Sequence, residues 1–131
     1  MPSNTEIVQQ AYKQFQSGDI DGVIAHLDTH VDWSVPKVEN ARVGGRHVGH
    51  DGVRNFFGML AADQDVVSFE PREFTSNDDT VIAIGDYRWR VKATGKEFAS
   101  PFAHAFTFRD GRIIRFREFS DTAAAAEGYR A

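Results

Sequence analysis

The chain contains no cysteine, so it forms no disulfide, offers no thiol nucleophile and builds no zinc–thiolate site. It has no basic excess either: the formal net charge is −4, whereas nucleic-acid-binding domains usually carry a basic surface. No apolar run approaches the roughly 20 residues of a membrane span, and the first residues lack the basic-then-apolar order of a signal peptide. We therefore expect a cytoplasmic protein that binds neither nucleic acid nor membrane.

Phenylalanine, in contrast, is abundant. The chain of 131 residues contains 11 Phe, and because Phe has no polar group, many of them must face a core, a pocket or a partner. A chain of this length usually forms one domain, and 41% hydrophobic with 26% charged residues is an ordinary globular mixture. We expect a single domain over residues 1–131.

Helical periodicity dominates the N-terminal part. Ser3 and Glu6 have the spacing of a capping box, and Gly18 is placed to end the helix that follows. Asp19 can cap a second, short helix, and Asp51 can cap a third. Residues 36–49, rich in glycine, are expected to form a loop between the first strand and the third helix.

After residue 63 the hydrophobic period changes from 3.6 to 2, which predicts strands. Pro71 predicts a bulge or an edge, and Asp110–Gly111 is typical of a two-residue hairpin turn. The expected strands, including a short one before the third helix, are Val31–Val35, Val66–Phe74, Val81–Ala93, Phe98–Arg109 and Arg112–Asp121. This order predicts an α+β domain, with three N-terminal helices packed on a curved, mainly antiparallel sheet. Residues 122–131 are expected to form a short helix or to fray.

Four segments of the sequence resemble SnoaL-like proteins. They are GDIDG at residues 18–22, VDW at 31–33, GHDGVRNFF at 49–57 and FAHAFTFRDGRIIRFRE at 102–118. The family belongs to the NTF2-like superfamily, together with ketosteroid isomerases and limonene-epoxide hydrolases. The resemblance implies a cone-shaped fold with a mostly apolar pocket between sheet and helices. It does not imply one activity, because this fold hosts isomerases, cyclases, hydrolases and non-catalytic modules.

The resemblance argues against ketosteroid isomerisation by the usual groups. Those enzymes use a carboxylate base at the end of the first strand, where this chain has Val35. Their oxyanion-binding tyrosine on the first helix falls at Ala11, with Tyr12 one residue away, and their protonated aspartate falls at His104. A shift of one residue along the first helix would restore the tyrosine.

His104 is the first candidate for chemistry, because it shares a strand face with phenylalanines. A neutral imidazole can donate to an oxyanion or accept a proton near pH 7. On the last strand, alternation places Ile114, Phe116, Glu118 and Ser120 on one face, and the resemblance implies that this face points inward. Glu118 could then act as an acid or base or orient His104. The alternatives are a histidine satisfied by its neighbours and a carboxylate paired with Arg42, Arg46 or Arg54.

Asp121 is the third candidate catalytic residue, since it ends the last strand near the expected mouth of the pocket. Its alternative role is to cap a C-terminal helix. Further side chains are expected to line the pocket and bind a ligand: Tyr12, Trp33, Val35, Phe57, Tyr87, Trp89, Phe102, Phe106, Phe116 and Ser120. His47 and His50 are three residues apart, but a zinc site needs a convergent third ligand, so no metal site is expected.

Two functions remain open from the sequence. The first is an isomerase, cyclase or dehydratase without a cofactor, which uses acid–base chemistry on a small hydrophobic carbonyl compound. The second is a non-catalytic module of the same fold that binds a small molecule or dimerises. Epoxide hydrolysis is disfavoured, because Asp86 and Arg88 are expected to face outward. The resemblance also implies a homodimer through the outer face of the sheet.

Overall fold

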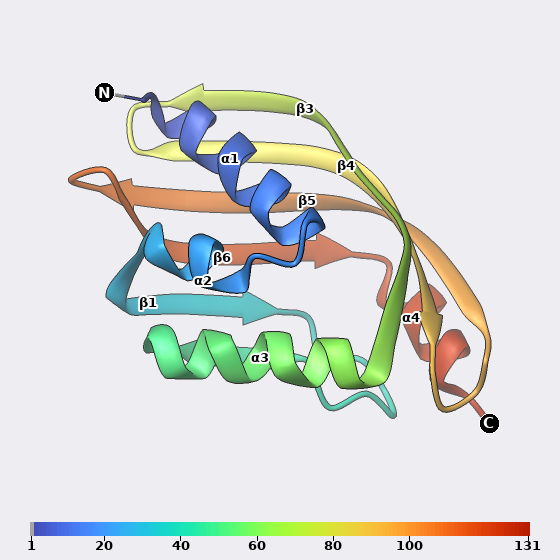
Figure 1. The fold of residues 1–131 in the computed structure, drawn as a ribbon. Coiled ribbons are helices and arrows are strands. Elements are labelled where there is room, and N and C mark those ends of the chain that lie inside the picture. Colours follow the sequence, from blue (N-terminus) through green and yellow to red (C-terminus); the bar gives the residue numbers. More distant parts are fainter. Residues whose placement is uncertain (1) are drawn as a thin grey trace.

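The structure, a computed structural model, describes residues 2–131. Its elements are α1 Asn4–Gln16, α2 Ile20–Ala25, β1 Leu27–Val35, β2 Gly45–Val48, α3 Gly49–Asp63, β3 Gln64–Asn77, β4 Thr80–Val91, β5 Glu97–Arg109, β6 Arg112–Ser120 and α4 Thr122–Tyr129. One six-stranded sheet and the helices that pack on it confirm the predicted α+β class (Figure 1). Within the described residues, no helix has the length and apolar character needed to cross a membrane.

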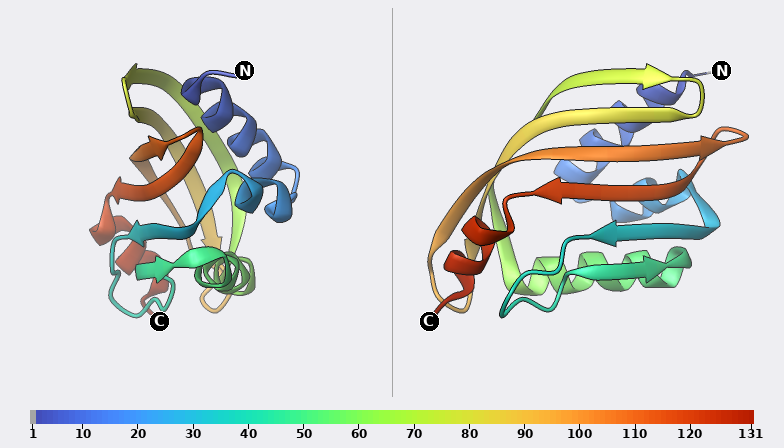
Figure 2. Two further views of the ribbon diagram at one scale, coloured as in Figure 1. Left: turned by 90° about the vertical axis from the view of Figure 1, so that its left-hand side faces the viewer. Right: turned by 180° about the vertical axis from the view of Figure 1, so that it is seen from behind.

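The sheet has the strand order β2-β1-β6-β5-β4-β3 and is strongly curved. Its concave side holds α1, α2 and α3, whereas α4 lies at the end where the sheet bends most (Figure 2). All neighbouring strands are antiparallel except β1 and β6, which run parallel. The sheet is therefore mixed, because the chain returns to the first strand only after completing the β3–β6 meander.

The predicted helix starts are correct for α1 and α2 but wrong for α3. The Ser3–Glu6 capping box is present, and Asp19 caps α2 by accepting a hydrogen bond from Gly22 N–H. Asp51, however, lies inside the first turn of α3, whose N-cap is Val48 without a side-chain bond. An acid at this position still interacts favourably with the positive end of the helix dipole.

The predicted loop over residues 36–49 contains an edge strand that sequence periodicity did not reveal. β2 is only four residues long and pairs antiparallel with β1, with Trp33 opposite His47. One apolar residue in four, Val48, leaves no alternation to detect. The strand exists because β1 offers unpaired backbone groups at its outer edge.

The β5–β6 hairpin sets which side chains of β6 face the concave side. Asp110 and Gly111 both have positive φ angles, 53° and 77°, as a tight two-residue turn requires. Phe108 pairs with Ile113, but Thr107 pairs with Arg115. The register shift inserts one extra residue, at position 114, and Ile113 rather than the expected Ile114 is the buried member.

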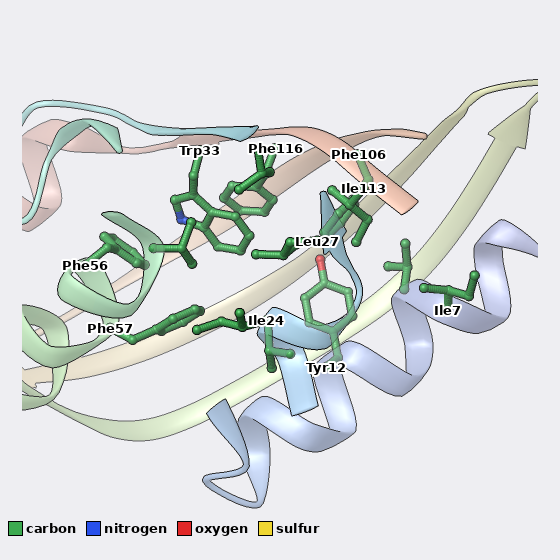
Figure 3. Close-up of a cluster of buried hydrophobic side chains, with 14 of the residues drawn as sticks. Ile7, Tyr12, Ile24, Leu27, Trp33, Phe56, Phe57, Phe106, Ile113 and Phe116 are labelled. Atoms are coloured by element: carbon green, nitrogen blue, oxygen red, sulfur yellow. The ribbon is translucent and has the colours of Figure 1, made fainter. Parts of the chain in front are cut away.

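The main core lies between the concave face and the three N-terminal helices (Figure 3). Trp33 and Phe116 stack face to face, with ring centroids 3.9 Å apart. Leu27 and Ile113 are each 1% exposed. Burying an apolar side chain of this size contributes about 1.5–3 kcal/mol, so these contacts fix the helices on the sheet.

Pro71 coincides with the expected bulge, since the β3–β4 register shifts between Pro71 and Glu73.

The C-terminal residues form a helix that closes one end of the fold. Asp121 is the N-cap of α4, and its Oδ1 accepts a hydrogen bond of 3.0 Å from Ala124 N–H. Tyr129 donates a hydrogen bond to Gln64 Oε1, and Thr94 donates to the Gly128 carbonyl. These contacts hold α4 against the strands and against the end of α3.

The capping role of Asp121 predicts how its variants behave. Asp121→Ala should lower the free energy of unfolding by about 1 kcal/mol, because the Ala124 N–H loses its acceptor. Asp121→Asn should retain nearly all the stability, since asparagine caps helices about as well as aspartate. Urea denaturation followed by circular dichroism measures both. Equal losses in the two variants would contradict a cap that depends on one side-chain oxygen.

Candidate functional site

A cavity of about 80 Å³, here called the first chamber, lies between the concave face and helices α1–α3. Most of its wall is apolar, and the polar exceptions are Tyr12, His104, Glu118 and the two tryptophans. It is lined by Ala11, Tyr12, Phe15, Val23, Leu27, Trp33, Val35, Phe56, Phe57, Leu60, Phe69, Trp89, His104, Phe106, Ile113, Phe116 and Glu118. Figure 3 shows Tyr12 reaching from α1 toward the strands that carry Phe106 and Phe116.

A second chamber of about 70 Å³ lies toward α4. It is lined by Val35, Pro36, Val38, Val43, Phe56, Leu60, Gln64, Tyr87, Trp89, Phe98, Glu118, Ser120 and Ala125. Five residues line both chambers: Val35, Phe56, Leu60, Trp89 and Glu118. Across the described chain, Glu118 is the one carboxylate that lines either chamber, and neither is lined by a lysine or arginine.

Tyr12, His104 and Glu118 form a continuous chain of hydrogen bonds in the wall of the first chamber. His104 and Glu118 are direct cross-strand partners on β5 and β6. His104 Nε2 lies 2.9 Å from Glu118 Oε1, and His104 Nδ1 lies 2.7 Å from the Tyr12 hydroxyl. His104 is 4% exposed, and the Phe102 ring stacks on it with centroids 4.3 Å apart.

The donors in this chain follow from the acceptor at its end. An ionised carboxylate can only accept, so His104 Nε2–H donates to Glu118. In the neutral imidazole, His104 Nδ1 then carries no proton and accepts from the Tyr12 O–H. Burial raises the pKa of Tyr12, and the nearby Glu118 charge raises it further, so the hydroxyl keeps the proton that it donates. Both ring nitrogens of His104 are therefore engaged, whereas Glu118 commits only one oxygen to this bond.

The second chamber adds a hydroxyl on the other side of Glu118. Tyr87 lies on β4 and Ser120 on β6, and both line this chamber. Burial raises the pKa of Tyr87, and the neighbouring Glu118 carboxylate raises it as well. Tyr87 therefore keeps its proton in neutral solution and is a hydrogen-bond donor close to the carboxylate.

The predicted site residues fall into distinct places. Of the ten expected to contact a ligand, all but Phe102 line a chamber. Phe102 instead packs beneath the site, where it stacks on His104. Asp121 lines neither chamber among the described residues and caps α4, which corresponds to its alternative role. Tyr12 supplies the hydroxyl from α1, and Ala11 contributes only a methyl group to the wall.

The expected alternative for Glu118, an ion pair with a nearby arginine, is wrong. Glu118 contacts His104 instead. The three arginines considered pair with other carboxylates: Arg42 with Asp63, Arg46 with Asp32, and Arg54 with Asp21. Asp86 lies on the outer face and pairs with Arg72, away from both chambers.

Several lining residues escaped sequence reasoning. Gln64 is 7% exposed, although it stands at the junction of α3 and β3 where a polar residue predicts a turn. Ala125 lies on a helix whose formation was left open. Phe69 carried a usable signal, because it is an aromatic residue in a predicted strand.

Trp33 Nε1 is buried and has no acceptor among residues 2–131.

The remaining histidines make local contacts. His47 Nε2 lies 3.0 Å from the Val43 carbonyl, and His50 Nε2 lies 2.9 Å from the Leu27 carbonyl. His26 Nε2 lies 2.8 Å from Gln14 Oε1. Over the described residues, no group of three or more His, Cys, Asp or Glu side chains is arranged to hold a metal ion.

Solved structures with the same architecture cover nearly the whole chain. An NTF2-like protein from Burkholderia thailandensis is 26% identical, with a TM-score of 0.91 and 100% of both chains covered. Another from Burkholderia xenovorans is 27% identical, with a TM-score of 0.87, 97% of this chain and 95% of that chain. TerC, co-crystallised with polyporic acid, is 26% identical, with a TM-score of 0.85 and 98% of each chain covered.

No curated protein matches the sequence of this chain. The model of the SnoaL-like domain, however, matches residues 8–116. That span contains every residue that lines the first chamber except Glu118, which lies on β6 two residues beyond the end of the span. Family match, architecture and NTF2-like neighbours agree, and the chain therefore belongs to the SnoaL-like domain family.

Proposed function

We propose that the protein is an enzyme that moves a proton on a small hydrophobic carbonyl compound, as an isomerase, cyclase or dehydratase does. Glu118 is the acid–base group. His104 is the positioning residue, and Tyr12 fixes its tautomer. The observation that carries the proposal is the Tyr12–His104–Glu118 chain, which places one supported carboxylate in the wall of a mostly apolar cavity.

The chemistry follows from the carboxylate oxygen of Glu118 that His104 leaves free. His104 holds one oxygen of Glu118, and the other oxygen can take a proton from a carbon next to a carbonyl. The negative charge then passes to the carbonyl oxygen, which a protonated hydroxyl can stabilise. Tyr87 supplies such a hydroxyl beside Glu118. Return of the proton from Glu118 to another carbon completes an isomerisation. If the enolate carbon instead attacks a second carbonyl, the proton goes to the new alkoxide and completes a cyclisation. If the enolate expels a β-hydroxyl group, the proton goes to the departing oxygen as water forms, which completes a dehydration.

His104 contributes by orientation rather than by a hydrogen bond to the substrate. Its two nitrogens are hydrogen-bonded to protein groups, and the ring centroids of Phe102 and Phe116 lie 4.3 and 4.8 Å from the imidazole centroid. A base held in one orientation by a neighbouring hydrogen bond reacts faster than one that must first be ordered. TerC, a neighbour crystallised with a small organic molecule, supports a small-molecule ligand for this fold.

We further propose a homodimer through the outer face of the sheet. Ile84, Ala103 and Phe119 lie side by side on β4, β5 and β6 as direct cross-strand partners. Ile84 is 43% exposed and Phe119 54% exposed. A row of apolar side chains across three strands is a self-complementary surface for a two-fold interface.

The proton-transfer proposal predicts the behaviour of Glu118→Gln. This variant keeps the shape of the side chain but cannot take a proton, so activity should fall by about 10²–10⁴-fold. Deuterium exchange at the CH₂ group of 1-phenylpropan-2-one in D₂O, followed by NMR, measures it. His104→Gln should lower kcat with a smaller change in KM, because neither imidazole nitrogen is free to bond to the substrate.

Asp121→Asn is the matched control, since it also replaces a carboxylate by an amide on the same end of β6. Its exchange rate should equal that of the wild type. Exchange that survives in Glu118→Gln would exclude Glu118 as the base. Binding of the ketone without any exchange in the wild type would favour the alternative, a module that binds its ligand without chemistry.

The raised pKa of Tyr12 predicts a pH dependence of stability. An unfolded tyrosine ionises near pH 10, whereas the buried hydroxyl stays protonated in the fold. The stabilisation is complete below pH 10 and is lost as the pH rises, at up to about 1.4 kcal/mol per pH unit for each such group. Tyr12→Phe removes one group, so its free energy of unfolding should fall less steeply above pH 10. Parallel slopes would contradict this.

The dimer proposal predicts that Phe119→Lys produces monomers, because a charge replaces the most exposed apolar side chain of the row. Light scattering coupled to size-exclusion chromatography measures the mass. Val66→Lys is the control, since Val66 is 49% exposed on the edge strand β3, outside the row. A wild-type monomer, or dissociation by both variants alike, would overturn this interface.

A further inference from the structure

Glu118 stands between two chambers rather than at the end of one. The first chamber extends from it toward α1, α2 and α3, and the second extends toward α4. Both are bounded by the same junction residues, with Val35 from β1, Phe56 and Leu60 from α3, and Trp89 from β4. A ligand group that reaches Glu118 therefore has space on two sides.

The two chambers are similar in size and differ in polarity. Their volumes are about 80 and 70 Å³. The polar groups that the first adds to the junction are Tyr12 and His104, which bond to each other, and Trp33, whose Nε1 has no acceptor among the described residues. The second adds Gln64, Tyr87 and Ser120. Each chamber can thus take an apolar group. The groups that can still bond to a ligand are the Trp33 N–H in the first chamber, Glu118 at the junction and the polar side chains of the second chamber.

The charge of the walls restricts the ligand further. For the described part of the chain, the chambers are lined by one carboxylate and by no lysine or arginine. A carboxylate or phosphate on the ligand would lose its hydration and face Glu118 without a compensating cation, which is costly in an apolar cavity. The substrate body that enters these chambers must therefore be neutral.

We infer that the substrate is a neutral, elongated molecule with two apolar ends, whose reacting carbonyl-bearing centre lies between the chambers at Glu118. The inference rests on the proposed function, since it describes the substrate of the same site. It assigns specificity to residues outside the hydrogen-bonded chain: Ala11 limits the first chamber, and Ala125 on α4 limits the second. Both positions carry only a methyl group, which leaves room for the two ends.

A series of three ketones tests the inference: propanone, 1-phenylpropan-2-one and 1,2-diphenylethanone. They share the carbonyl centre and differ in having no, one or two rings. Each added ring should tighten binding to the wild type at least about tenfold, because each buries new apolar surface. Isothermal titration measures the affinities. Diphenylacetate, which has two rings and a negative charge, should bind at least about tenfold more weakly than 1,2-diphenylethanone.

Ala125→Leu should remove the gain from the second ring, so that the one-ring and two-ring ketones bind alike. Ala123→Leu is the matched control, because Ala123 is exposed on the same helix and lines neither chamber among the described residues. Ala11→Leu should remove the same gain from the other side. Thermal denaturation identifies a variant that fails to fold, and the wild-type series then decides alone.

The outcomes separate this inference from the proposed function. A wild type that gains nothing from the second ring, or a gain that survives in folded Ala125→Leu, overturns the two-ended substrate. Deuterium exchange on 1-phenylpropan-2-one is measured independently. If exchange is present and the affinity series is flat, the proton-transfer function stands and the substrate class falls. If the series holds without exchange, the same ligand class is bound by a non-catalytic site.

Discussion

The candidate site depends on one extra residue in β6. The Asp110–Gly111 turn pairs Arg109 with Arg112, and an uninterrupted ladder from that start would place Arg117 opposite His104. The register shift before Arg115 moves the pairing by one, so that Glu118 lies opposite His104 instead. Because side chains alternate between the two faces of a strand, the same shift sends Arg117 to the outer face. The bulge thus decides whether the cavity wall carries a carboxylate or a guanidinium.

The bulge also explains how three polar groups are accommodated in an apolar core. A buried polar group without a partner costs about 1–3 kcal/mol, and the phenylalanines around His104 offer no partner. Opposite Glu118, the imidazole can satisfy both nitrogens at once, through the carboxylate and through Tyr12. Loss of any one member leaves a neighbour unsatisfied, so the network is rigid. Rigidity of this kind gives a reacting carboxylate a defined direction.

Sequence patterns predicted the local structure better than the long-range contacts. The Ser3 cap, the Asp110–Gly111 turn and the bulge near Pro71 follow from residue types within a few positions of each other, and all three are present. The parallel pairing of β1 with β6 joins segments far apart in the chain and leaves no local signal. The bulge at position 114 has no glycine or proline to mark it, because a register shift is a property of two strands.

The candidate site residues show the same contrast between what local patterns predict and what depends on tertiary packing. His104 and Glu118 were paired from strand alternation, which assumed that Ile114 shares their face. Ile113 takes that place instead. The register shift lies before Phe116, however, so Phe116, Glu118 and Ser120 still share one face of β6, as predicted. The position of Tyr12 could not be predicted equally well, because neighbouring residues on a helix differ in direction by about 100°. Only the packing of α1 on the sheet determines which of Ala11 and Tyr12 reaches His104.

The carboxylate of the candidate site stands on β6 rather than at the end of β1. Ketosteroid isomerases carry the base at the position of Val35, whereas here the carboxylate comes from β6 and Val35 is part of the apolar junction between the chambers. A base at the end of β1 would also stand at this junction, because Val35 lines both chambers. The carboxylate on β6 differs in being held by His104, its cross-strand partner. Under the proposed function, the acidic carbon of the substrate lies at this junction, and the space on both sides of Glu118 determines which groups can flank that carbon.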